Sequence, residues 1–256
     1  MTRWKLTLEY DGAGFAGWQK QANALSVQEV LEEALGRLNG GEAVFVQGAG
    51  RTDAGVHADG QVAHADLGRA LSPERLREAL NALVRPHPVT VLLAESVPET
   101  FHARFDARQR FYRYRILNRA APPVLEAHRV GHVRRPLDEG RMNQASAILL
   151  GRHDFSTFRA QGCQASGPVR TLDRLEWVRD GEILTGFVEA RSFLYHQVRI
   201  MVGTVALVGL GLWSLDDLAQ AFKACDRTRG GPTAPAQGLY LRGVRYDAVD
   251  AVPENQ

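Results

Sequence analysis

Lysine and cysteine are both scarce in this 256-residue chain. Only Lys5, Lys20 and Lys223 are lysines, so arginine supplies 28 of the 31 basic residues. The two cysteines, Cys163 and Cys225, are too few and too far apart for a structural zinc site or a disulfide framework. We therefore expect a reducing, cytoplasmic setting and a surface rich in guanidinium groups, which suit phosphate and stacking.

Long apolar runs are also missing from the sequence. The longest run, Ile200 to Trp213, contains three glycines and a threonine and is shorter than the roughly 20 residues needed to span a bilayer. Residues 1–10 lack the apolar core of a signal peptide. The run from Ile200 is therefore predicted to be a buried helix, and no membrane association is expected.

Common nucleotide-binding fingerprints are absent as well. A G-x-G-x-x-G pattern beginning at Gly48 would need glycine in place of Asp53, and no Gly-Lys-Ser/Thr follows. Neither a dinucleotide-binding loop nor a P-loop is supported. The hydrophobic content of 45% and the formal charge of +2 describe an ordinary globular chain with enough apolar residues for a core.

The stretch from Gly48 to Asp66, GAGRTDAGVHADGQVAHAD, concentrates glycine, an Arg-Thr-Asp triplet and two His-Ala-Asp triplets. It follows the apolar alternation of Val44, Phe45 and Val46, so a strand is expected to lead into it. Its glycines permit tight turns or close approach to a ligand. We interpret this stretch as the reactive centre.

Asp53 has three readings from the local sequence. Its carboxylate caps its own turn, as Asp before Ala-Gly often does. Alternatively, a metal site is built from His57, Asp59, His64 and Asp66. In the third reading Asp53 is a reactive carboxylate, kept ionised by Arg51 on the same face of an extended segment. The residues alone leave all three open.

Periodicity in the first half predicts the order βαββαβ. The expected elements are a strand at 4–10, a helix from a Ser26–Glu29 capping box to Leu38, strands near 43–47 and 60–66, a helix beginning at Ser72-Pro73, and a strand at 89–94. Residues 97–109 are expected to connect this half to the next.

The same order is predicted again from Arg110. The expected elements are a strand to Leu117, a helix near 137–150, a hairpin around Asp180-Gly181, helices near 195–210 and 215–225, and a strand at 239–246. We infer an α+β fold of two ferredoxin-like units with a central cleft. The predicted boundaries are residues 1–106, residues 107–247 and a tail at 248–256.

A basic stripe with aromatic residues runs from His102 to Arg119. It contains six arginines, at positions 104, 108, 110, 113, 115 and 119, and one acid, Asp106. Phe111, Tyr112 and Tyr114 interleave with the charges, which is the composition of a surface that tracks an RNA backbone and stacks bases. The alternative is a strand with one solvated charged face and one buried aromatic face.

Eight segments distributed over the chain carry a family resemblance. They are EYDGAGFAGWQKQ from Glu9, SVQEVLEEAL from Ser26, GAGRTDAGVHADGQVAH from Gly48, FHARFDA from Phe101, RFYRYRILN from Arg110, LLGRHDFSTFRA from Leu149, YHQVRIMVG from Tyr195 and QGLYLRGVRY from Gln237. On these segments the chain resembles the tRNA pseudouridine synthase A (TruA) family. The resemblance implies a pseudouridine-synthase-type fold, which agrees with the two α+β halves.

The resemblance also implies roles for individual residues. It places the catalytic aspartate, as nucleophile, on Asp53, an active-site tyrosine on Tyr112, and active-site arginines on Arg51 and Arg199. Tyr112 would stack on uracil and assist proton transfer, while Arg199 could pair with Asp53. Arg110, Arg113 and Arg115 are expected to bind substrate together with Tyr112. Residues 113 and 115 share one strand face with Phe111 and not with Tyr112.

Three functions are compatible with these features. The first, implied by the resemblance, is a cofactor-free isomerase that converts uridines 38, 39 and 40 of the tRNA anticodon stem-loop to pseudouridine, with no metal and as a homodimer. The second is an RNA-binding module without catalysis. The third is a metal-dependent hydrolase using the two His-Ala-Asp triplets.

Overall fold

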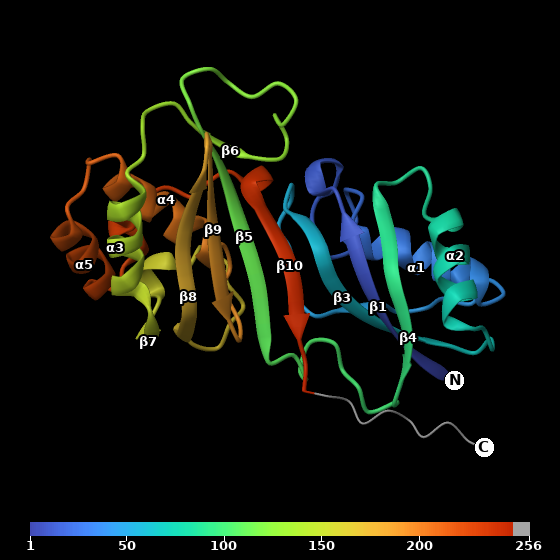
Figure 1. Cartoon of the computed structure of the whole chain (residues 1–256). Helices are drawn as coiled ribbons and strands as arrows, with labels where there is room; N and C mark the ends of the chain where they lie inside the picture. Colours follow the sequence, from blue (N-terminus) through green and yellow to red (C-terminus); the bar gives the residue numbers. More distant parts are fainter. Residues whose placement is uncertain (248–256) are drawn as a thin grey trace. The chain divides into compact units, whose positions relative to one another are not determined.

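The computed structural model describes residues 1–247, shown in Figure 1. Contacts between Cα atoms divide this chain into two compact units. Unit 1 comprises Met1–Arg108 and, among the described residues, 241–247, while unit 2 comprises Gln109–Tyr240. Each unit contains strands and helices.

Unit 1 contains strands that pair largely antiparallel and two helices. Its elements are β1 (Thr2–Tyr10), a 3-10 helix (Gly12–Gly14), α1 (Val27–Leu38), β2 (Gln47–Gly48), β3 (His57–Leu67), α2 (Pro73–Leu83), β4 (Val89–Val97) and most of β10 (Leu239–Arg245). The strand order is β4-β1-β3-β10, and β2 pairs with β3. Helix α2 packs against β4, and α1 packs against α2.

The alternation predicted for the first strand is confirmed. Trp4, Leu6 and Leu8 are at most 2% exposed, and they share one face of the strand. Opposite them on β3 lie Ala65, Ala63 and Gln61, which share that face. The side chain of Ser26 accepts the Glu29 N–H and starts α1 at the predicted residue.

The strand predicted at 43–47 is wrong over most of its length. Only Gln47–Gly48 pairs with β3. Val44 and Val46 are buried and Phe45 is 66% exposed, so the alternation is real. However, the Val46 N–H donates to Glu32 Oε1 and the Val46 carbonyl accepts from Gln28 Nε2, at 3.2 and 3.1 Å. Because side chains of α1 occupy these backbone groups, no strand pairing forms there.

Unit 2 contains an antiparallel group of strands with three helices. Its elements are β5 (Gln109–Asn118), β6 (Gly131–Val133), α3 (Glu139–Leu149), β7 (Gly151–Asp154), β8 (Val169–Asp180), β9 (Ile183–Ala190), α4 (Gln197–Gly209) and α5 (Leu215–Lys223), with 3-10 turns at Ser156–Phe158, Arg227–Arg229 and Ala236–Gly238. The strand order is β5-β9-β8-β7, and the short β6 pairs with β5 in parallel. Helix α3 packs on β8 and contacts both α4 and α5, which lie beside it in Figure 1.

Trp177 of β8 fixes the packing of α3 in unit 2. Asn143 bonds to both the N–H and the carbonyl of Trp177, at 2.8 and 2.9 Å, and the Trp177 indole donates to Ser146 Oγ. A Cβ at Gly186 would lie 2.8 Å from the Trp177 ring, so glycine gives the indole its space. These contacts hold α3 against β8 and give the buried indole N–H a hydrogen-bond partner.

The predicted α+β fold class is confirmed. In unit 1 the elements follow the predicted order βαββαβ, and unit 2 adds the short β6 and β7 to its series. The predicted boundary between residues 106 and 107 stays a prediction; the division by contacts differs from it mainly in giving residues 241–247 to unit 1. The predicted tail lies outside the described residues. Within residues 1–247, every helix falls short of the length and apolarity needed to cross a bilayer.

Candidate active site

Asp53 lies in the loop of residues 49–56, between β2 and β3. The loop is closed by its own backbone, because the Val56 N–H donates to the Asp53 carbonyl at 3.1 Å. Its first half is tied to β3 by two hydrogen bonds, from Ala49 N–H to the Val62 carbonyl and from Gln61 Nε2 to the Gly50 carbonyl. Asp53 is partly buried and Arg51 is exposed. Backbone groups of Ala49, Gly50, Asp53 and Val56 therefore anchor the loop at both ends.

The segment from Tyr10 to Trp18 packs against this loop at Thr52. The Trp18 N–H donates to the Thr52 carbonyl at 3.0 Å, and the Tyr10 hydroxyl lies 2.8 Å from Thr52 Oγ1. Gly17 has φ of +102°, and a Cβ there would lie 2.5 Å from the Thr52 carbonyl oxygen. Glycine is thus required for the two segments to come this close.

His57 supports the other end of the loop. It is 3% exposed, and its Nδ1 accepts the Gly12 N–H at 3.0 Å. An Asp11 carboxylate oxygen lies 3.1 Å from the same nitrogen. Because Nδ1 accepts the Gly12 N–H through its lone pair, the Gly12 hydrogen bond favours a ring without a proton on Nδ1. A Cβ at Gly12 would lie 2.0 Å from the Val56 carbonyl oxygen, so close packing again depends on glycine.

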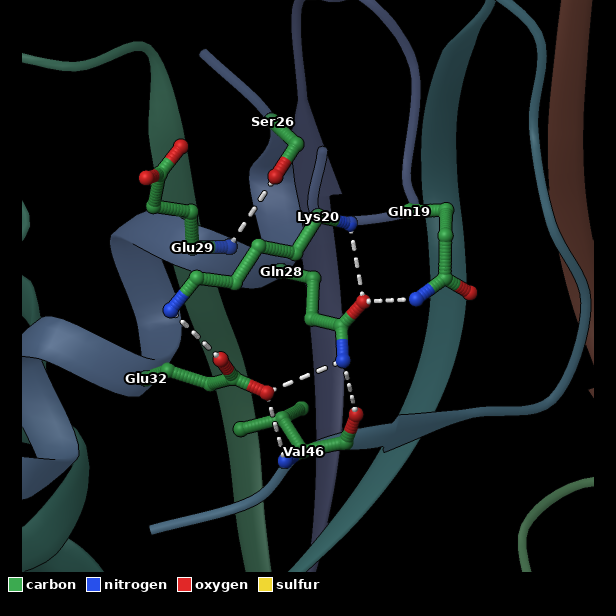
Figure 2. Close-up of polar contacts among 7 residues, drawn as sticks. All are labelled: Gln19, Lys20, Ser26, Gln28, Glu29, Glu32 and Val46. Atoms are coloured by element: carbon green, nitrogen blue, oxygen red, sulfur yellow. Dashed lines mark hydrogen bonds and ion pairs between the residues drawn. The ribbon is translucent and has the colours of Figure 1, made fainter. Parts of the chain in front are cut away.

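A buried glutamine braces the segments on both sides of the loop. Figure 2 shows Gln28, which is 3% exposed, donating to Val46 and Glu32 and accepting from the Gln19 side chain and the Lys20 N–H. Its own N–H donates to the Trp18 carbonyl. Gln28 thereby connects α1 to Val46, just before β2, and to residues 18–20, which include the end of the segment that packs on the Asp53 loop.

The proposed metal ligands have other partners in the structure. His57 Nδ1 accepts from Gly12, His64 Nδ1 accepts the Ala103 N–H at 3.1 Å, and Asp66 pairs with Arg3 at 2.7 Å. Across residues 1–247, no group of three or more histidine, cysteine or acidic side chains is arranged to hold a metal ion. The metal-site reading of the two His-Ala-Asp triplets therefore has no geometric support.

In unit 2, Tyr112 lies on β5 opposite Val188 of β9. Its ring makes a T-shaped contact with the Phe193 ring, at 5.2 Å between centroids and with the planes perpendicular. Tyr112 is partly buried, which leaves part of its surface accessible. The aromatic contact fixes one side of the ring.

The arginines predicted to bind substrate make contacts within unit 2. Arg113 lies over the Tyr240 ring at 4.7 Å, and Arg115 faces both carboxylate oxygens of Glu126 at 3.1 Å. Arg110 is 9% exposed and donates to the Arg191 carbonyl. These residues therefore contribute to folding, whatever they contact in a substrate.

Arg199 is the third residue of α4, as the sequence predicted from YHQVR. Its Nε donates to the Ala234 carbonyl at 2.8 Å, and its own carbonyl accepts the Ala234 N–H. The Tyr114 hydroxyl donates to the neighbouring Pro235 carbonyl at 2.9 Å, and burial raises the pKa of that phenol, so it stays protonated. Arg199 and Tyr114 together hold the loop of residues 230–238 near the start of α4.

The supporting residues of the Asp53 loop were not identified from the sequence. Gly12, Gly17, Trp18 and Gln28 lie in segments quoted only as family signatures. The signal was present, because two glycines flanking aromatic residues are typical of close backbone approach. The sequence does not show which residues the glycines approach, namely Thr52 and its neighbours.

Comparisons with known proteins identify relatives across nearly the full chain. A family model described as tRNA pseudouridine synthase matches residues 7–106 and 145–247. The tRNA pseudouridine synthase A of Beijerinckia indica is 58% identical over 246 residues, covering 96% of this chain and 94% of that protein. The protein of the same name from Rhodospirillum rubrum is 54% identical over 99% of this chain and 91% of its own length. That from Acidiphilium cryptum is 55% identical over 100% of both.

Proposed function

The chain belongs to the tRNA pseudouridine synthase A family, an isomerase family acting on uridine in tRNA, and we propose that it modifies uridines 38, 39 and 40 of the anticodon stem-loop. The reaction detaches uracil from ribose by breaking the N-glycosidic bond, turns the base, and rejoins it through C5. A stacked base must first leave the helix, which costs a few kcal/mol and least next to a loop. That cost fits a target at the end of the anticodon stem.

Asp53 is the proposed nucleophile. Its carboxylate acts on the glycosyl unit, by attack either at ribose C1′ or at uracil C6. The observation that carries this assignment is the support of its loop: two ties to β3, the Thr52 contacts, and Gly12 and Gly17 at close approach. A catalytic group needs such a fixed position, because displacement by about 1 Å can cost roughly 100-fold in rate.

Three other residues complete the proposed site. Arg51 and Arg199 are the arginines of the proposed site, and their guanidinium groups supply its positive charge. Tyr112 stacks on the base and assists proton transfer at C5. The T-shaped contact between the Tyr112 and Phe193 rings supports this role, because it restricts the orientation of the Tyr112 ring on which the base would stack.

The remaining proposals concern the setting of the enzyme. Its partner is tRNA, its working form is a homodimer, and its site of action is the cytoplasm, where tRNA is modified. Neither a metal nor an organic cofactor is required. Turnover should therefore continue in excess EDTA, with monovalent salt keeping the tRNA folded.

Replacing Asp53 by asparagine tests the assignment directly. Asparagine keeps the shape and the backbone turn made by the residue 53 carbonyl, but removes the charge and the nucleophile. We expect nearly unchanged thermal stability and tRNA affinity with no detectable pseudouridine, a loss of at least about 1,000-fold. Affinity and single-turnover product formation should be measured on one preparation. Substantial turnover with intact binding would falsify the catalytic role of Asp53.

Tyr112→Phe separates stacking from proton transfer. Phenylalanine keeps the stacking surface, worth about 1–3 kcal/mol per base, and lacks only the hydroxyl. We expect tRNA binding to survive while turnover falls. Full activity of this variant would remove the hydroxyl from the mechanism and leave Tyr112 a stacking role only.

A further inference from the structure

Phe105 is an exposed aromatic residue on the connection between β4 and β5. Its side chain is 69% exposed, although aromatic residues usually contribute to the core. One side of its ring lies on the His102 ring, at 4.3 Å between centroids and 33° between planes. The Arg104 guanidinium lies 5.8 Å from the same ring. We refer to His102, Arg104 and Phe105 as the crossover patch.

The crossover patch is carried by a rigid turn. The N–H groups of Arg104 and Phe105 both donate to His102 Nδ1 at 3.2 Å. The His102 N–H donates to an Asp106 carboxylate oxygen at 2.7 Å, and the Asp106 N–H donates back to the His102 carbonyl. These four bonds fix the direction in which the Phe105 ring projects.

The turn is also anchored to the sheet of unit 1. Ala103 is fully buried, its N–H donates to His64 of β3, and its carbonyl accepts the Tyr246 hydroxyl at 2.7 Å. Phe101 and Ala103 belong to one buried cluster with Val62 and Ala49. Ala49 is the first residue of the loop that carries Asp53, so the patch has a fixed position relative to that loop within one unit.

We propose that the crossover patch binds an unpaired nucleobase of the tRNA, which stacks on Phe105 while Arg104 contacts an adjacent phosphate. The inference rests on the proposed function and adds a nucleotide contact away from the reacting uridine. An exposed ring beside a guanidinium is the arrangement that binds single-stranded RNA. The exposed residues next to Phe105 in the sequence are all charged, namely Arg104, Asp106 and Arg108, and Arg108 is paired with Asp247. Charged rather than apolar sequence neighbours favour RNA over a protein partner.

If a base stacks on Phe105, tRNA affinity should depend on the aromatic surface at position 105. Phe105→Ala removes one base–aromatic contact, so it should weaken tRNA binding about tenfold. The loss of affinity should exceed any loss of turnover at saturating tRNA. Phe105→Trp should restore affinity, because indole stacks at least as well. Since Phe105 is exposed, neither change should lower the melting temperature appreciably.

Phe45 provides a matched control. It lies in the same unit and is 66% exposed, nearly the same as Phe105. We expect Phe45→Ala to bind tRNA like the parent. Tryptophan variants at both positions add a direct readout, since a base stacked on indole quenches its fluorescence. Titration with a tRNA transcript should quench Phe105→Trp more strongly than Phe45→Trp.

Equal affinities of Phe105→Ala and the parent, or equal quenching at the two positions, would overturn the proposal. So would a shift in sedimentation of Phe105→Ala with unchanged tRNA affinity, because this result would assign the patch to a protein contact. The affinity comparison does not depend on turnover. A parent that binds tRNA but forms no pseudouridine would refute the proposed function while leaving the stacking result to be decided by binding.

Discussion

The Asp53 loop and strand β5 carry the two groups of candidate site residues, and they are held in different ways. The loop is fixed through backbone atoms, by Trp18 on Thr52 and by Gln61 on Gly50. On β5 the candidate side chains are themselves engaged, Arg113 with Tyr240 and Arg115 with Glu126. A loop anchored through backbone atoms keeps these anchors when one of its side chains is replaced, whereas replacing Arg113 or Arg115 removes a contact that the fold itself uses.

Among changes outside the proposed reacting residues, the largest effect should come from breaking the close approach to the loop. Gly17→Ala places a Cβ 2.5 Å from the Thr52 carbonyl oxygen at a φ of +102°. Strain of this kind costs about 1–3 kcal/mol before the overlap is counted. We expect a clear loss of thermal stability and a fall of roughly 100-fold or more in turnover, because the loop must shift.

Alanine substitutions at two other glycines separate the steric overlap with Thr52 from the strain of a positive φ. A Cβ at Gly14 meets nothing within 4 Å, and one at Gly40 meets nothing either but has a φ of +76°. Gly14→Ala should leave turnover unchanged, and Gly40→Ala should show the conformational strain alone. If Gly17→Ala keeps turnover near that of Gly40→Ala, close approach to Thr52 does not position Asp53.

The second prediction removes Gln28, which connects α1 to Val46, just before β2, and to residues 18–20. Gln28→Leu keeps the volume but leaves the buried Val46 carbonyl and the partly buried Lys20 N–H without the partner that Gln28 provides (Figure 2). Each buried unsatisfied group costs about 1–3 kcal/mol, so the unfolding free energy should fall by roughly 2–4 kcal/mol. Urea unfolding measures this loss. The same change at Gln220, exposed on α5, should cost little, and equal costs would contradict the bracing role.

Much of this arrangement was predictable, and the exceptions have physical causes. Helix 27–38 was predicted at its observed bounds because a cap and an apolar stripe are local signals. The error at residues 43–47 arose because alternation reports burial and not pairing. Val46 is buried and extended, but the side chains of Gln28 and Glu32 occupy its backbone groups. That competition depends on tertiary contacts, which no local pattern contains.

The site residues show the same limit. Asp53 and Arg199 were placed on a loop and at a helix start, where the structure has them, because their segments are distinctive. The partners of Arg113 and Arg115, at positions 240 and 126, are far away in sequence or lie in a connecting segment. Phe105 lies within the range of the basic stripe, but only Phe111, Tyr112 and Tyr114 were named as its aromatic residues, since a sequence does not tell an exposed phenylalanine from a buried one.

The third prediction tests, through its pH dependence, the His64 contact that anchors the turn of residues 102–106. Burial, with the nearby Arg3 and His102, lowers the pKa of His64 from 6.5 to about 4. The unfolded chain therefore binds a proton near pH 6.5 while the folded chain binds it only near pH 4. Stability contributed by neutral His64 is complete above pH 6.5 and is lost as the pH falls toward 4, by at most about 3 kcal/mol.

His64→Asn provides the control for this titration. Asparagine does not titrate, and its Oδ1 can accept the Ala103 N–H that His64 Nδ1 accepts. The variant should be less stable or equal at pH 7 but lose less stability between pH 6.5 and 4.5, as judged by urea midpoints. A parent and variant with the same pH dependence would show that other groups govern acid sensitivity.

The smallest effect should distinguish the two arginines of β5. Arg113 lies over the Tyr240 ring, and a guanidinium over a ring can still donate hydrogen bonds. Arg115 faces the Glu126 carboxylate, so its charge is already neutralised in the folded protein. Arg113 is therefore the better candidate for a phosphate contact. Arg113→Ala should reduce the slope of log affinity against log salt by about one unit, and Arg115→Ala by less.

Stability measurements are needed to interpret these slopes, because each arginine also contributes to folding. Arg152→Ala, at an exposed arginine of β7, supplies the reference for loss of one surface charge. If Arg113→Ala matches Arg152→Ala in slope and differs only in melting temperature, the stack on Tyr240 is the whole function of Arg113. If its slope is lower by about one unit at unchanged fold, then a side chain engaged with its own protein also binds the substrate, and the contrast between loop and strand is one of degree.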